Sequence, residues 1–128
     1  MTKLMLMVFL GGGIGSMLRY AVQLLFAGRI TPGSFPWSTF AVNLAGSFLI
    51  GLFYALAGRF NLSAESKLFL TTGICGGFTT FSTFSYEGVS LLRQGLYGTF
   101  FAYVAGSVIF GLGTAFAGAY CGKLFMGK

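Results

Sequence analysis

Long apolar runs separated by short polar links form the main pattern of this sequence. The runs cover about residues 4–27, 37–57, 67–92 and 97–125. The hydrocarbon core of a bilayer is about 30 Å thick and requires roughly 20 apolar residues in helical conformation, so each run can cross a membrane as one helix. The pattern predicts an all-α membrane protein with four transmembrane helices, organised as a single membrane domain over residues 1–128.

The first run, residues 4–27, carries a glycine pair and one charged residue. Lys3 precedes it as in a secretory signal, but the run exceeds signal length and contains Arg19, so we predict a retained helix. Gly11 and Gly15 have the GxxxG spacing that lets two helix backbones approach closely in lipid. A charge as deep as Arg19 is costly unless it reaches an interface or faces a watery cavity. The sequence leaves both possibilities open.

A carboxamide interrupts the second run, residues 37–57. Trp37 opens this run at the interfacial depth that tryptophan favours, and Asn43 follows about two turns later between apolar neighbours. A carboxamide in that setting must be hydrogen-bonded or must meet a polar pathway. Asn43 is therefore predicted either to join two helices by a hydrogen bond or to face a polar pathway.

The third run, residues 67–92, contains glycines and threonines that favour an interrupted helix. Gly73, Gly76 and Gly77 lie together near its middle, so we expect a non-helical break near residues 75–79. Carbonyls freed by such a break suit a cation such as Na⁺, and the amide end of the following half-helix suits an anion. The alternative is a simple kink in which Ser and Thr side chains repair the helix.

The second half of this run carries an aromatic face beside a hydroxyl face. Residues three apart are neighbours on a helix, which groups Phe78, Phe81 and Phe84. The adjacent face carries Thr79, Ser82 and Ser85. Aromatic rings have positive potential at their edges, so rings and hydroxyls together can stabilise a small anion without a formal charge. The alternative for the rings is ordinary helix packing. Glu87 follows as a vestibule charge or a helix-end residue.

The fourth run, residues 97–125, repeats the small-residue pattern. Gly118 and Gly122 again have GxxxG spacing, which predicts close helix packing. Tyr103 and Ser107 are four residues apart and share a helix face. Four helices with such small contact surfaces are too thin to enclose a pore, so we expect a dimer.

Composition and charge agree with a membrane protein. The chain is 55% hydrophobic and only 8% charged, with a mean hydropathy of +0.84. Its net charge of +6 comes from singly scattered residues, so we expect lipid contacts and no nucleic-acid partner. Neither Cys75 nor Cys121 has a metal-site spacing, and both are expected to be small buried hydrophobes. We expect no enzymatic activity.

The distribution of basic residues gives a modest prediction of topology. An even number of spans places both termini on one side of the membrane. Five basic residues are expected on that side, namely Lys3, Arg59, Lys67, Lys123 and Lys128. Arg29 and Arg93 are expected on the other side. This bias favours cytoplasmic termini without excluding insertion in both orientations.

Three motifs resemble a known family. The segments Gly76–Glu87, Val42–Gly46 and Gly15–Arg19 resemble the Fluc (CrcB) fluoride channels of microbes, and the similarity covers essentially the whole chain. The resemblance implies an antiparallel, dual-topology homodimer in the inner (plasma) membrane. It also implies a function, which is passive and selective export of F⁻ that relieves cytoplasmic fluoride toxicity.

The resemblance also implies roles for individual residues. Together with the hydroxyl face, it gives an expected fluoride pathway of Asn43, Phe81, Ser82, Thr83, Phe84, Tyr103 and Ser107. Arg19 and Glu87 are expected in a vestibule. The backbone carbonyls of Gly76 and Thr79, from both subunits, are expected to hold a structural Na⁺. Gly111 stands where some relatives carry a second serine, and we assign it no contact with the ion.

Two other functions fit parts of the sequence. A small proton-coupled exporter of cationic compounds needs a titratable group deep in the membrane, whereas the only acidic residues, Glu65 and Glu87, lie in or near segment ends. A non-transporting membrane assembly subunit would explain the GxxxG pairs. It would not explain the aromatic and hydroxyl faces together.

Overall fold

The computed structural model describes residues 1–29 and 33–126, with side chains up to Leu124. Three long helices are continuous: α1 (Thr2–Phe26), α2 (Trp37–Phe60) and α6 (Tyr97–Met126). Each contains a window long and apolar enough to cross a membrane, ending at Leu124 in the case of α6. The prediction of an all-helical membrane protein is confirmed.

The third apolar run forms one column of shorter helical pieces. In chain order these are α3 (Ala64–Leu68), a π-helical segment (Phe69–Cys75), α4 (Gly76–Phe78) and α5 (Ser82–Arg93). The backbone leaves helical geometry at Thr79, where φ is −81° and ψ is 159°. The expected break near residues 75–79 is therefore placed slightly too early, because Gly76 and Gly77 remain helical and the break spans residues 79–81.

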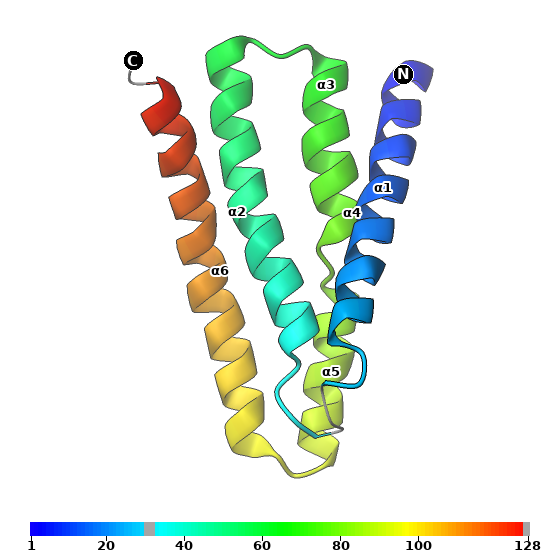
Figure 1. Cartoon of the computed structure of the whole chain (residues 1–128), viewed down its shortest axis with the longest axis vertical. Helices are drawn as coiled ribbons and strands as arrows, with labels where there is room; N and C mark the ends of the chain where they lie inside the picture. Colours follow the sequence, from blue (N-terminus) through cyan, green and yellow to red (C-terminus); the bar gives the residue numbers. More distant parts are fainter. Residues whose placement is uncertain (30–32, 127–128) are drawn as a thin grey trace.

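The four columns run alternately up and down (Figure 1). The start of α1, the end of α6 and the link between α2 and α3 lie at one end, and the α5–α6 turn lies at the other. The helix α2 lies between α6 and the broken column, which in turn lies beside α1. Both termini thus share one side, as an even number of spans requires.

The end that carries the termini is the more basic one. Four of the five basic residues expected there are described, at Lys3, Arg59, Lys67 and Lys123, and Lys128 lies outside the described residues.

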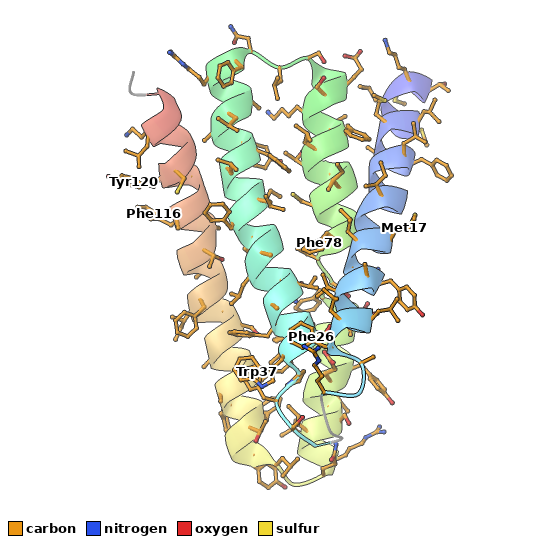
Figure 2. The ribbon with its side chains drawn as sticks, viewed as in Figure 1. Met17, Phe26, Trp37, Phe78, Phe116 and Tyr120 are labelled. Carbon is orange, nitrogen blue, oxygen red and sulfur yellow. The ribbon has the colours of Figure 1, made fainter. Side chains whose placement is uncertain are left out.

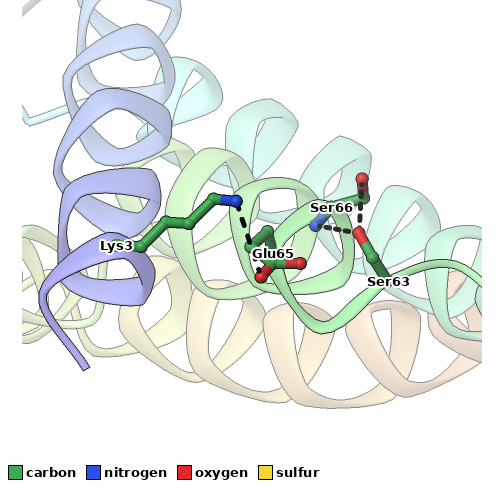
Figure 3. Close-up of polar contacts among 4 residues, drawn as sticks. All are labelled: Lys3, Ser63, Glu65 and Ser66. Atoms are coloured by element: carbon green, nitrogen blue, oxygen red, sulfur yellow. Dashed lines mark hydrogen bonds and ion pairs between the residues drawn. The ribbon is translucent and has the colours of Figure 1, made fainter.

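Figure 3 shows how α3 begins at this end. Ser63 Oγ accepts a hydrogen bond of 3.2 Å from the Ser66 amide and so caps the helix. A backbone hydrogen bond at Glu65 lowers the pKa of this carboxyl most. The Lys3 ammonium, whose Nζ lies 4.0 Å from Glu65 Oε1, lowers it further.

Paired glycines bring α1 against the first half of the broken column. A Cβ on Gly11 would lie 2.6 Å from the Phe69 carbonyl oxygen, and one on Gly15 would collide with the Ile74 carbonyl oxygen. Gly73 and Gly77, which are also four residues apart, face α1 in return. The GxxxG pair of α1 therefore packs against a second pair with the same spacing.

The α2–α6 contact uses the same principle. A Cβ on Gly118 would collide with the Phe48 carbonyl oxygen, and one on Gly122 would lie 2.6 Å from Ala55 Cβ. The predicted packing role of this second GxxxG pair is confirmed. Large side chains instead cover the outer faces: Met17 and Phe116 are 74% and 76% exposed and point away from the bundle in Figure 2.

Candidate functional site

The break in the third column is held open by a side chain from α2. Asn43 Nδ2 donates a 3.1 Å hydrogen bond to the Thr80 carbonyl, and the Thr80 amide donates a 2.9 Å bond to Asn43 Oδ1. The carboxamide thus satisfies both backbone groups of Thr80, which the break removes from helical pairing. Of the two roles left open for Asn43, the structure shows helix joining, and the second Nδ2 hydrogen stays available to another acceptor.

A second set of side chains binds the end of the first half-helix from α1. Arg19 Nε donates a 3.2 Å hydrogen bond to the Gly77 carbonyl, and Ser16 Oγ lies 3.5 Å from the same oxygen. The carbonyl end of a helix carries partial negative charge, so the guanidinium is well placed there. The two options for Arg19 were an interface or a watery cavity; the structure instead shows a part-buried side chain whose guanidinium binds a backbone carbonyl.

A cavity of about 370 Å³ lies beside the break. It is formed by α2, the broken column and α6. Its walls are Asn43, Gly46, Ser47, Ile50, Cys75, Gly76, Thr79, Thr80, Phe81, Phe84, Ser107 and Val108. All of these residues are uncharged, so the cavity offers hydroxyl, amide and aromatic groups without a fixed charge.

Two rings form the aromatic part of this wall. The ring centroids of Phe81 and Phe84 are 5.9 Å apart and the rings are tilted by 40°. Phe81 is 78% exposed, so its ring is open to whatever enters or covers the cavity. The expected grouping of Phe78 with these rings is wrong, because the non-helical residues 79–81 separate Phe78, at the end of α4, from α5. The same break separates Thr79 from the predicted hydroxyl face.

Ser107 supplies a buried hydroxyl on the α6 side of the cavity. Its Oγ is buried and has no hydrogen-bond partner among the described residues. An unpaired buried hydroxyl is costly, which makes it a candidate donor to an ion or water in the cavity. Ser47 also lines this cavity, from α2, and sequence reasoning missed it. The available signal was its position one helical turn after Asn43.

Three residues expected on the pathway do not line the cavity. Tyr103 is fully buried, and its hydroxyl donates a 3.0 Å hydrogen bond to Glu87 Oε1. Its ring lies against Phe84, with centroids 5.0 Å apart, and so supports the cavity wall from behind. Ser82 Oγ lies 3.5 Å from Thr80 Oγ1, and the Thr83 amide donates to that same oxygen. Tyr103, Ser82 and Thr83 thus contact residues of the cavity wall without lining the cavity themselves.

The two residues expected in a vestibule lie in different surroundings. Glu87 contributes to a second cavity of about 280 Å³, which is also lined by Gln23, Phe26, Ala27, Gly28, Ser38 and Thr39. Arg19 is absent from the described walls of both cavities and is held at the break. The structure therefore does not bring Arg19 and Glu87 together.

The carbonyls of Gly76 and Thr79 are left without donors. The Thr80 amide, which would pair with Gly76 in a continuous helix, binds Asn43 instead, and the Thr83 amide binds Thr80 Oγ1. No hydrogen bond between described residues ends on either carbonyl. The described residues also contain no cluster of His, Cys, Asp or Glu that could hold a metal.

The comparison with family models decides the affiliation. The model described as CrcB-like protein, Camphor Resistance (CrcB), matches residues 6–119. The chain belongs to the CrcB-like family. Three relatives of this CrcB-like chain are named fluoride-specific ion channel FluC. The one from Bacteroides fragilis is 51% identical over 96% of this chain and 98% of its own length.

The other two relatives are also similar over most of both chains. The protein from Phocaeicola vulgatus is 52% identical over 86% of this chain and 90% of its own length. The protein from Thermus thermophilus is 48% identical over 95% of this chain and 97% of its own length. These relatives are named as channels, in agreement with the expectation that this CrcB-like chain is not an enzyme. The chain is a multi-pass membrane protein.

Proposed function

We propose that this chain forms a passive fluoride-specific ion channel. The observation that carries the proposal is the uncharged cavity at the helix break, which is lined by the Phe81 and Phe84 rings and by the Ser107 hydroxyl, which has no partner among the described residues. Full-length similarity to proteins named fluoride-specific ion channels supports the same function. No catalytic step is required.

The chemistry of the cavity suits a small, strongly hydrated anion. Fluoride that enters must exchange water for other hydrogen-bond donors, and Ser107 and the second Nδ2 hydrogen of Asn43 are suitable donors. Positive ring edges add favourable potential. A fixed positive charge would hold the anion too strongly, whereas several weak sites allow it to leave. Arg19 is kept from the cavity by its bond to Gly77.

We propose that two antiparallel copies make the complete channel, inserted in both orientations. The exposed Phe81 ring and the open cavity wall support a second copy covering this face. A light-scattering mass of one chain in detergent would contradict the dimer. For the orientation, an N-terminal tag should react with a membrane-impermeant reagent in roughly half of the copies, since the basic bias between the two ends is modest.

We also propose that a structural Na⁺ binds the carbonyls of Gly76 and Thr79. Both oxygens lack donors, and alkali cations prefer such oxygen ligands. Two carbonyls from one chain are too few to enclose a cation, which is why the second copy is needed. Bound Na⁺ would neutralise the carbonyl end of the first half-helix. Replacing Na⁺ by a large organic cation should lower the thermal stability of the dimer, and unchanged stability would count against the site.

The cellular role proposed is export of fluoride across the inner (plasma) membrane. Fluoride accumulates in an acidified environment because neutral HF crosses lipid and dissociates inside the cell, so a passive channel can return F⁻ down its gradient. Protein reconstituted in sealed vesicles should release internal F⁻ to a fluoride electrode when a K⁺ carrier balances the charge. Protein-free vesicles give the background rate. Release that requires an imposed proton gradient would favour a coupled exporter instead.

A further inference from the structure

A second hydroxyl faces the cavity from α2. Ser47 lies four residues after Asn43, so the two side chains share one face of α2, and both line the 370 Å³ cavity. Ser107 contributes a hydroxyl to the same cavity from α6. The cavity therefore has hydroxyl groups on two neighbouring helices.

The Ser47 hydroxyl is not used within the protein. Serine and threonine in a helix commonly donate to the carbonyl four residues earlier. Thr71 does so at 2.7 Å and Thr79 at 2.9 Å. No such bond, or any other between described residues, is made by Ser47. Its hydrogen is thus available to a group inside the cavity.

The α6 side leaves space next to this hydroxyl. Gly111 follows Ser107 by one turn, and the nearest atom to a Cβ built on Gly111 is Ser47 Oγ, at 3.8 Å. This is an ordinary contact distance, so a small side chain on residue 111 would fit. Because residue 111 is glycine, it contributes no hydroxyl of its own beside Ser47.

We propose that Ser47 is a further anion-contacting residue, whose hydroxyl donates a hydrogen bond to F⁻ one turn beyond Asn43. This proposal rests on the proposed channel function. The donor extends the path of weak sites along α2, so the anion moves from one donor to the next without meeting a charge. A purely structural serine would contribute to helix packing and leave the flux unchanged.

The test measures F⁻ efflux from reconstituted vesicles, first after the Ser47 hydroxyl is removed and then after a hydroxyl is added at a neighbouring position. Ser47→Ala should lower the F⁻ efflux rate by roughly tenfold, the scale expected for losing a hydrogen bond to a charged group. Adding Gly111→Ser to Ser47→Ala should restore most of the rate, because the new hydroxyl occupies the space beside residue 47. The matched control adds Gly113→Ser, which meets no atom within 4 Å and should restore nothing.

The possible outcomes are distinguishable. If the unmodified protein releases no F⁻, the channel function itself is wrong. If it conducts and Ser47→Ala conducts equally well, the role of Ser47 is wrong. Equal repair by Gly111→Ser and Gly113→Ser would also overturn it, because position would then be irrelevant. The mass and thermal stability of each variant in detergent show whether a lost rate reflects misfolding.

Discussion

Asn43 and Thr80, 37 positions apart in the sequence, are joined by two hydrogen bonds of 3.1 and 2.9 Å. The bridge connects a continuous helix, α2, to the point where the third column stops being helical. It satisfies an amide and a carbonyl that would otherwise be unpaired inside a membrane protein. The break is thus a structured element that depends on a partner helix.

Replacing Asn43 by alanine should therefore damage both stability and transport. The variant leaves the Thr80 amide and carbonyl without partners, which we expect to lower the free energy of unfolding by about 1–3 kcal/mol. We expect F⁻ efflux to fall by at least roughly tenfold, since the cavity wall moves and loses a donor. Thermal unfolding in detergent and vesicle efflux measure the two effects.

A matched asparagine provides the control for this variant. Asn61 is exposed and has a positive φ of 50°, a backbone conformation that glycine adopts freely. Asn61→Gly removes a carboxamide outside the bundle and should leave efflux unchanged. An Asn43→Ala protein as stable and as active as Asn61→Gly would show that the bridge has no role.

Arg19 should act through the Gly77 carbonyl. Arg19→Met removes both the charge and the 3.2 Å hydrogen bond, and we expect a loss of about 1.5–3 kcal/mol in unfolding free energy, typical for a bond to a charged group. Arg19→Lys keeps the charge but loses the planar donor group, so an intermediate stability is expected. Arg93→Met, at the exposed end of α5, is the control. Lysine and methionine variants of equal stability would refute the contribution of charge.

The glycine contact between α1 and the broken column can be tested by adding one methyl group. Gly15→Ala would drive a Cβ into the Ile74 carbonyl and should destabilise the protein by about 1–3 kcal/mol through overpacking. Gly13→Ala meets no atom within 4 Å and should be neutral or slightly stabilising, because alanine favours helix. The same loss in both variants would indicate a general effect on α1 and not a specific contact. Thermal unfolding in detergent compares the pair.

The ring pair should matter for conduction and not for folding. Phe81→Ile or Phe84→Ile removes an aromatic edge from the cavity wall, and we expect F⁻ efflux to fall by roughly tenfold, equivalent to about 1.4 kcal/mol in a barrier. Phe116→Ile changes a ring that points away from the bundle (Figure 2) and should conduct normally. Normal efflux from both cavity variants would show that these rings have only a packing role.

Much of the fold follows from local patterns in the sequence. Gly11 with Gly15, and Gly118 with Gly122, predict close helix packing from spacing alone, and each pair meets a neighbouring backbone or small residue. Three long apolar runs became continuous helices. Such predictions succeed because length and small-residue spacing act within a single helix.

The position of the break depends on contacts that spacing does not reveal. Glycine destabilises helix, which placed the predicted break near Gly76 and Gly77, yet both residues remain helical. Their backbone packs against α1, and Arg19 binds the Gly77 carbonyl. The helix ends instead beside the residue that Asn43 can bridge. A contact across 37 positions is a tertiary property.

The same limit applies to side chains at the site. Tyr103 and Ser107 share a helix face in sequence, but the Tyr103 hydroxyl binds Glu87 while Ser107 remains unpaired at the cavity. Helical periodicity predicts which residues share a face of the helix, but it does not predict which group each side chain will contact. Ser47 was visible as the residue one turn after Asn43, although only the cavity walls show that both face the same space.

The central claim is selective, passive movement of fluoride. The most direct measurement loads one preparation of vesicles with equal F⁻ and Cl⁻ and follows the efflux of both ions, without a proton gradient. F⁻ should leave far faster than Cl⁻, because the uncharged cavity offers weak hydrogen-bond donors that suit the smaller, more strongly hydrated ion. Equal efflux of the two halides, or no F⁻ efflux above that of protein-free vesicles, would contradict the claim.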